Sequence, residues 1–379
     1  GNMPAGADGK TIDGMSIDRV EQLIGSLKNE TYQPNPSKRT YIPKKNGKKR
    51  PLGIPSFDDK LVQEVVRMIL EAIYEGSFEH TSHGFRPKRS CHTALIDIQK
   101  TFTAVKWFIE GDIKGFFDNI NHDVLINILR ERIADERFLR LIRKFLNAGY
   151  VEDWVFHRTY SGTPQGGIIS PILANIYLDK FDKYIKEYIN RFNKGVTRKG
   201  DARYKLYEQR RYRLAKKLKN EKDVKVRKQM TAEIKRLREE RNNYPARNEM
   251  DSSIKRLKYV RYADDFLIGI TGNLKDCKTV KEDIKNYLNE ALKLELSDEK
   301  TLITNAQKPA KFLGYDVFIR RCNDLRKDKY GKTVRAFGHK PVLYLNFETM
   351  RKKLFDYKAA RIAVVNGKEV WKSIVRTYM

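Results

Sequence analysis

The segment YVRYADDFLIGI, residues 259–270, places two adjacent acids inside an otherwise apolar, β-prone run. Asp264 and Asp265 repel each other and lose hydration in such a setting, so a sequence built for stability alone would not contain them. The pattern predicts a β-hairpin with the acidic pair at its tip. An acidic pair held there requires a compensating cation or a function.

Mg²⁺ is the natural compensating cation, because it takes oxygen ligands and is usually held by one or two carboxylates together with substrate phosphates. The run KWFIEGDI, residues 106–113, predicts a buried strand that ends at Asp112, where an acid lies at a surface or cleft. With Asp264 and Asp265, Asp112 would complete a site for two Mg²⁺ ions about 4 Å apart that clamp the attacking and leaving oxygens of a phosphoryl transfer.

The charge balance points to a polyanionic partner. The formal net charge is +29, from 77 Lys+Arg against 48 Asp+Glu, and the 40% hydrophobic content is that of a folded protein. Nucleic acid is the leading candidate, because no apolar run approaches the ~20 residues of a membrane span. An anionic membrane surface is the weaker alternative.

The cysteines and the amino terminus bear on the compartment. Three isolated cysteines argue against a disulfide framework and favour a reducing compartment. The sequence opens with Gly1 and shows no signal peptide, so we expect a protein that is not secreted, and an excised or cleaved piece of a longer chain.

The composition changes between about residues 191 and 250, which hold 21 Lys+Arg against 8 Asp+Glu. Apolar residues at helical spacing on either side of KNEKD, residues 219–223, predict two helices that form a hairpin. A solvated charged arm would explain the glutamates and the weak apolar stripe, whereas an RNA-binding insertion would explain the charge imbalance. Both interpretations stay open.

Five stretches, in a set order, resemble the successive blocks of reverse transcriptases, most closely those encoded by group II introns. They are DIKGFFDNINHDVL (112–125), GTPQGGIISPILANIYLD (162–179), YVRYADDFL (259–267), LSDEKTLI (296–303) and FLGYDVF (312–318). Upstream, KKRPLGIPSFDDKLVQ (48–63) and HGFRPKRSCHTAL (83–95) are similar to that family's finger blocks. The resemblance covers roughly residues 38 to 320.

The resemblance implies an α+β fold of the right-hand polymerase type, with an antiparallel palm sheet packed on helices. We expect fingers with a short N-terminal extension over residues 1–105. The palm, the remaining finger elements and the basic helical insertion near 191–250 would occupy residues 106–325. Residues 326–379 would begin a truncated thumb, with NFETMRKKLFDYKAA (346–360) as its clearest helix.

By motif position, the resemblance makes Asp112, Asp264 and Asp265 the catalytic and metal-binding triad for two Mg²⁺ ions. The backbone carbonyl of Ile113 would be an extra ligand.

Four further positions would contact the incoming nucleotide. Phe117 takes the place of the aromatic gate, whose ring would clash with a ribose 2′-hydroxyl; either Phe117 or the adjacent Phe116 could instead be a core residue. Gln165 would lie against the nucleotide. Lys44 and Arg50 match finger cations that contact the triphosphate.

Lys300 lies where polymerases can place a group that protonates the pyrophosphate leaving group. A surface ion pair with Asp298 or Glu299 explains Lys300 equally well. The last block resembles the primer grip, and its first two residues could equally be ordinary core: Phe312, Leu313, Gly314 and Tyr315.

The resemblance implies an RNA-directed DNA polymerase of a group II intron retroelement that also binds intron RNA in splicing and mobility. Its partners would be an RNA template, intron RNA, a DNA primer or target and deoxynucleoside triphosphates, in a bacterial cytoplasm or an organelle and without a membrane. Two alternatives remain: a splicing cofactor whose palm is mainly a scaffold, and a related reverse transcriptase of a retron or defence system. The carboxylate triad favours a polymerase over a pure RNA binder, which gains nothing from acids facing phosphates.

Overall fold

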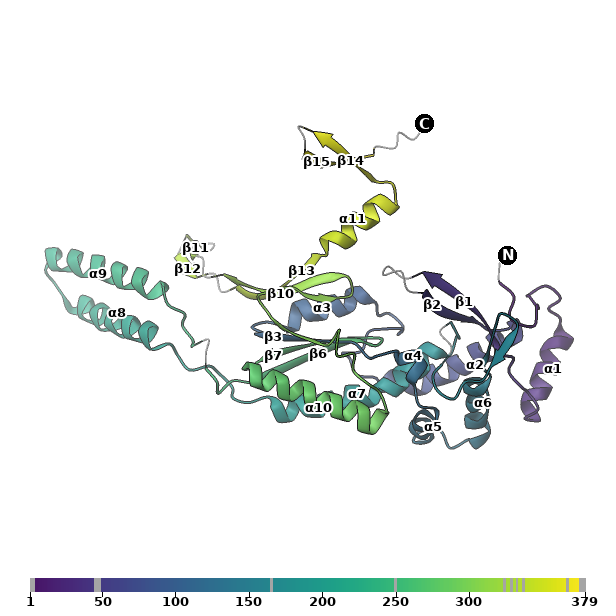
Figure 1. The fold of residues 1–379 in the computed structure, drawn as a ribbon. Helices are drawn as coiled ribbons and strands as arrows, with labels where there is room; N and C mark the ends of the chain where they lie inside the picture. Colours follow the sequence, from purple (N-terminus) through teal and green to yellow (C-terminus); the bar gives the residue numbers. More distant parts are fainter. Residues whose placement is uncertain are drawn as a thin grey trace.

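A four-stranded antiparallel sheet forms the centre of the molecule (Figure 1). In the computed structural model, the described residues are 4–43, 49–163, 166–248, 251–322, 325–327, 330–331, 333–335, 338–365 and 368–374. The strand order is β6 (Arg256–Tyr262), β7 (Asp265–Thr271), β3 (Trp107–Gly111) and β8 (Leu302–Asn305). The hairpin expected at residues 259–270 is β6–β7, and the strand expected before Asp112 is β3.

Helices cover one face of this central sheet, and a helix together with a further sheet covers the other. Helices α7 (Ser170–Phe192) and α10 (Leu274–Leu292) pack below it in Figure 1, and α3 (Cys91–Thr101) packs above it. Because successive side chains of a strand point to opposite faces, Ile109 joins the core under α7 and α10, while Phe108 joins the core under α3. The sheet is therefore buried on both faces, which explains the apolar sequence of β7.

A second sheet lies towards the N-terminus, in the order β2-β1-β4-β5. Its strands are β1 (Ser37–Pro43), β2 (Lys49–Ile54), β4 (Tyr150–Glu152) and β5 (Val155–His157). Strands β1 and β2 pair in antiparallel register, with Pro43 opposite Lys49. Residues 44–48, between the two strands, lie outside the described residues. Helices around this sheet are α1 (Ile17–Lys28), α2 (Phe57–Tyr74), α4 (Phe116–Asn119), α5 (His122–Arg130) and α6 (Glu136–Asn147).

Residues 302–374 continue from the central sheet into a mixed region. A three-stranded sheet comprises β13 (Gly338–Leu345), β10 (Tyr315–Cys322) and β9 (Ala310–Phe312). The helix expected at 346–360 is α11 (Phe347–Asp356), which begins where the Asn346 side chain accepts a hydrogen bond from the backbone of Thr349. A hairpin of β14 (Ala360–Val365) and β15 (Lys368–Ser373) follows it. The division into fingers, palm and thumb stays a prediction.

The basic segment forms the expected helical hairpin, α8 (Ala202–Asn220) and α9 (Val224–Asn242), here called the arm. Figure 1 shows it projecting away from the central sheet. No described residue of α8 is buried, and α9 buries only Leu237 and Asn242 among its described residues. The α+β fold with an antiparallel sheet packed on helices is confirmed.

Candidate active site

The acidic pair lies at the turn between β6 and β7, with Asp264 in the turn and Asp265 as the first residue of β7. Tyr262 pairs with Asp265 at the end of the hairpin, so Ala263 and Asp264 make the turn. Ala263 has a φ of +55°, a backbone region that residues with side chains adopt rarely. Both aspartates are half-buried. The structure thus places the acids at the hairpin tip, as their sequence predicts.

Asp112 joins them from the neighbouring strand. The register of β3 and β7 sets Gly111 opposite Phe266, so Asp112 emerges beside Asp265, and the charge of Asp112 contributes to the raised pKa of Asp265. The carbonyl of Asp112 accepts a hydrogen bond from the backbone N–H of Ser297 at 2.9 Å. Two adjacent strands therefore bring the three aspartates to one edge of the central sheet.

Burial and mutual repulsion make this cluster reluctant to ionise. Burial, followed by the charges of Asp264 and Asp112, raises the pKa of Asp265 to about 7. Burial also raises the pKa of Asp264, while the cations of Lys300 and Arg50 act in the opposite direction. A cation placed among these carboxylates would therefore stabilise their charged forms.

The aspartates fit Mg²⁺ held jointly with a substrate. Within the described ranges, no group of three or more His, Cys, Asp or Glu side chains is arranged to enclose an ion by itself. Asp112 does accept a cation, because its carboxylate binds the Lys300 ammonium at 2.8 Å. Mg²⁺ commonly keeps several waters and completes its shell with substrate phosphates, so a protein cage is not required.

The predicted extra ligand, Ile113, is buried next to Asp112. It forms an isolated antiparallel bridge with Leu296, whose hydrogen bonds run from Lys114 N to Glu295 O and from Ser297 N to Asp112 O. The bridge ties the end of β3 to the segment that carries Lys300. Metal binding by the Ile113 carbonyl stays a prediction.

The structure separates the two neighbouring phenylalanines. Phe116 is buried and packs 6.5 Å from the ring of Tyr177. Phe117 is half-buried, with its ring 5.3 Å from Phe116 and 6.5 Å from Phe85. Phe85 is 52% exposed, has a φ of +55° and lies 6.4 Å from the ring of Tyr262. Phe116 is thus the core residue, and Phe117 belongs to an aromatic group beside the acidic turn.

Two of the predicted nucleotide contacts, Lys44 and Gln165, lie outside the described residues. The segments that flank Gln165 are anchored nearby: Thr163 N donates to Phe117 O at 2.7 Å, and Ile168 N donates to the Gln63 side chain at 2.8 Å. A Cβ on Gly166 would meet the carbonyl of Gly53, in β2, at 2.4 Å. Only glycine therefore allows this loop to touch the strand that carries Arg50.

The two remaining predicted cations lie at the cluster. Arg50 is exposed at the start of β2, and its positive charge acts to lower the pKa of Asp264. Lys300 binds Asp112, whereas Asp298 binds Lys285 at 3.5 Å. The alternative that paired Lys300 with a neighbouring acid is therefore wrong, because the segment folds back onto β3 and presents the ammonium to Asp112.

The predicted primer grip is a tight turn between β9 and β10. Phe312 pairs with Tyr315, and the two turn residues both have positive φ, +50° at Leu313 and +82° at Gly314. Phe312 is buried in the core beneath α3, and Leu313 and Tyr315 pack against that core. The packing confirms a core role for Phe312, and primer contact stays a prediction.

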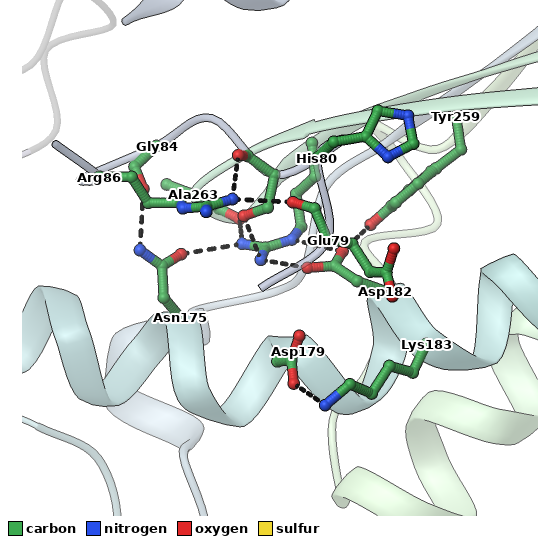
Figure 2. A network of polar contacts seen from close by, with 12 residues as sticks. Glu79, His80, Gly84, Arg86, Asn175, Asp179, Asp182, Lys183, Tyr259 and Ala263 are labelled. Carbon is green, nitrogen blue, oxygen red and sulfur yellow. Dashed lines mark hydrogen bonds and ion pairs between the residues drawn. The ribbon is translucent and has the colours of Figure 1, made fainter. Parts of the chain in front are cut away.

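Sequence reasoning missed a buried polar network directly behind the acidic turn (Figure 2). It joins Arg261 of β6 to Asn175 and Asp182 of α7 and to Ser82. The signal was present in the opening segment, since an arginine inside a buried strand requires a buried acid to pair with it. The sequence alone does not say which acid that is.

Comparison with known proteins agrees with this geometry. Residues 42–203 and 236–317 match the family Reverse transcriptase (RNA-dependent DNA polymerase), and the chain belongs to it. Within that family, the chain is 45% identical over 373 residues to the group II intron-encoded protein LtrA of Lactococcus lactis subsp. cremoris, covering 97% of this chain and 61% of LtrA. The predicted resemblance to group II intron-encoded reverse transcriptases is confirmed.

Other relatives extend the comparison. The chain is 40% identical over 341 residues to the putative COX1/OXI3 intron 1 protein of Saccharomyces cerevisiae, covering 89% of this chain and 39% of that protein. It is 35% identical over 312 residues to YkfC of Escherichia coli K12, covering 81% and 72%. The apo telomerase of Candida tropicalis aligns with a TM-score of 0.45 at 14% identity, over 80% of this chain and 51% of that one.

The chain spans about three fifths of the length of LtrA. Over the part of the chain that the structure describes, no helix combines the length and the apolar character needed to cross a bilayer.

Proposed function

We propose that this chain is the polymerase part of a group II intron-encoded reverse transcriptase and adds deoxynucleotides to a primer 3′-hydroxyl on an RNA template. The observation that carries the proposal is the convergence of Asp112 with the Asp264–Asp265 pair at one edge of the central sheet. Family membership supports the same reaction.

Asp112, Asp264 and Asp265 would hold two Mg²⁺ ions, with the Ile113 carbonyl as an extra ligand. When bound, Mg²⁺ supplies positive charge to the triphosphate and to the attacking 3′-oxygen. Because burial and the neighbouring carboxylates raise the pKa of Asp265 to about 7, cation binding there would compete with protonation near neutral pH.

The surrounding residues have separate tasks. Lys44 and Arg50 would neutralise the triphosphate, and Gln165 would lie against the nucleotide. The ring of Phe117 would exclude a 2′-hydroxyl. The Asp112 carboxylate holds the protonated amine of Lys300 at the cluster, where it would give a proton to the pyrophosphate oxygen. The turn from Phe312 to Tyr315 would support the primer.

The partners follow from the reaction and the charge. They are an RNA template, a DNA primer or target, deoxynucleoside triphosphates and structured intron RNA, in a bacterial cytoplasm or an organelle. A second candidate function, assistance of intron splicing through RNA binding, is favoured by the basic arm, whose helices lie outside the core. One protein can perform both functions. Similarity to intron-encoded proteins supports this assignment over a retron or defence enzyme.

The test replaces both acids, Asp264→Asn and Asp265→Asn, in one protein. Primer extension on an RNA template should fall at least about 1,000-fold, because neutral amides hold the ions of a two-metal transfer poorly. RNA binding should survive, because its salt-dependent Lys/Arg contacts are untouched. A control that removes the same charge elsewhere, Glu239→Gln with Glu240→Gln on the arm, should keep extension.

A thermal melt confirms that each variant is folded. If the folded double-Asn variant extends a primer near the parental rate, the two aspartates do not act in the reaction and the proposal fails.

A further inference from the structure

Arg261 is completely buried behind the acidic turn, and all five of its N–H groups have acceptors. Its partners are Asp182 Oδ1 (2.8 Å) and Oδ2 (2.5 Å), Asn175 Oδ1 (3.2 Å), Ser82 Oγ (2.7 Å) and the carbonyl of Ala263 (2.8 Å). One guanidinium thus joins helix α7, the loop of residues 78–90 and the turn that carries the acids.

Helix α7 supplies the anchor for this contact. Asp182 is buried with Arg261 and also accepts a hydrogen bond from the Tyr259 hydroxyl at 2.6 Å. Asn175, two turns earlier on the same face of α7, donates to the carbonyl of Gly84 at 2.8 Å. Figure 2 shows Asn175 and Asp182 rising from α7 toward Ala263 and Gly84.

The backbone of the loop holds the turn from a second side. Arg261 N donates to Thr81 O at 2.8 Å, and His83 N donates to Arg261 O at 2.9 Å. A Cβ on Gly84 would lie 2.3 Å from Ala263 N, so the turn rests directly on a glycine. The position of Ala263 is therefore determined by Arg261 and Gly84 together.

Stability is a weak explanation for this arrangement. A buried ion pair often contributes no more to folding than well-packed apolar residues would. Ala263 holds a positive φ, which persists only where the surroundings determine it. The guanidinium binds the Ala263 carbonyl, which belongs to the peptide bond leading into Asp264. The guanidinium of Arg261 therefore holds the backbone that leads directly into Asp264 and Asp265.

We propose that Arg261, anchored by Asp182, is a positioning residue that sets Asp264 and Asp265 against Asp112 for divalent cation binding. The inference rests on the proposed function of the three aspartates. Loss of this contact should weaken cation binding and lower kcat, while the KM for nucleotide and the affinity for RNA change little, since the cations that meet phosphates are elsewhere.

Arg86 provides a matched control in the same loop. Its side chain is also buried, forms an ion pair with Glu75 at 2.8 Å and donates to the carbonyls of Glu79 and Ser82. It therefore supports the loop through contacts that do not involve Ala263. Arg86→Lys should loosen the loop while it leaves the guanidinium of Arg261 and its contact with the Ala263 carbonyl in place, so it should disturb the acids less than Arg261→Lys does.

The experiment measures Mn²⁺ binding by electron paramagnetic resonance, together with primer extension and a thermal melt, for the parent, Arg261→Lys and Arg86→Lys. We expect Arg261→Lys to weaken Mn²⁺ binding and lower kcat by about 10-fold or more, as losses of residues that orient metal ligands do. Arg86→Lys should weaken Mn²⁺ binding less than Arg261→Lys does, because it leaves the contact between Arg261 and the Ala263 carbonyl in place. Parental Mn²⁺ affinity in folded Arg261→Lys would overturn the inference.

A second variant, Gly84→Ala, leaves Arg261 in place and adds a Cβ that would collide with the backbone nitrogen of Ala263. Gly84→Ala should weaken Mn²⁺ binding as Arg261→Lys does. If Arg261→Lys does not fold, Gly84→Ala is the deciding variant, and unchanged Mn²⁺ affinity in it would overturn the inference. The Mn²⁺ site in question is the one whose binding is abolished by the double substitution Asp264→Asn with Asp265→Asn. If the parent binds Mn²⁺ there but extends no primer, the proposed function fails, while the positioning role is still judged by Mn²⁺ affinity.

Discussion

Phe116 and Phe117 are adjacent and chemically identical, and only their surroundings distinguish them. Phe116 points into the core against Tyr177, whereas Phe117 keeps part of its ring accessible beside Phe85 and the acidic turn. The backbone of Phe117 is held by the hydrogen bond that its carbonyl accepts from Thr163. A ring held on both sides can act as a steric limit, because it cannot move aside for a larger sugar.

Phe117→Ala should therefore admit ribonucleotides more readily, by about 10-fold or more in kcat/KM relative to deoxynucleotides. Single-nucleotide incorporation with each sugar measures the ratio. The adjacent control is Phe116→Ala, which should cost about 3–5 kcal/mol of folding stability through the cavity it leaves. An active Phe117→Ala variant with parental sugar discrimination would place the gate at another residue.

The arm, which consists of helices α8 and α9, lies outside the hydrophobic core. Its two helices join through Glu208, which binds Arg211 of its own helix at 2.6 Å and Arg241 of α9 at 2.7 Å. Tyr207 of α8 stacks on Tyr244, which follows α9, at 5.7 Å. The hydrogen bonds to the two arginines lower the pKa of Glu208 to about 2, with Arg211 the larger cause.

A lowered folded-state pKa fixes the direction of the pH effect. The stabilisation by Glu208 is present above its ordinary pKa of 4.5 and is lost as the pH falls from there toward 2. Glu208→Gln should therefore lower hydrogen-exchange protection of both arm helices at pH 6.5, by about 0.5–1 kcal/mol because solvent screens this partly exposed group.

The difference between Glu208→Gln and the parent should narrow at pH 3, where the parent carboxylate begins to take up its proton. Glu239→Gln, an exposed position on the same arm, serves as the control and should leave protection unchanged. Equal protection of the parent and Glu208→Gln at pH 6.5 would show that this ion-pair network does not join the helices.

At the scale of the whole molecule, positive charge is distributed unevenly. The segment from 191 to 250 carries nearly half of the net charge of +29 and lies largely in the projecting arm. The arm leaves and rejoins the body through two paired positions, Lys194 with Lys255 and Gly200 with Arg247. Such a base allows the arm to be removed without cutting the central sheet.

Replacing residues 201–246 with a short Gly/Ser linker should weaken binding to structured RNA and flatten its salt dependence. Each lost phosphate contact lowers the log–log slope by roughly 0.7 to 0.9. Binding titrations over a range of salt concentrations measure the slope. Extension of a short primer serves as the control and should persist, because the aspartates lie on the central sheet. Identical slopes for the two proteins would favour the interpretation as a solvated charged arm.

The sequence by itself determined the family, the hairpin that presents Asp264 and Asp265, the strand that ends at Asp112 and the helical arm. These features depend on periodicity, turn position and composition among neighbours in the chain, and such local signals survive without knowledge of the fold.

Only the tertiary structure decided which side chains meet. Lys300 binds Asp112 across 188 positions of sequence, and Arg261 binds Asp182 across 79 and Ser82 across 179. Many acids could have paired with either cation. For Arg261, burial makes the choice, because a charge enclosed by the core must find its partner on whichever element the fold packs against it. For Lys300, the bridge between Ile113 and Leu296 brings its segment to the end of β3.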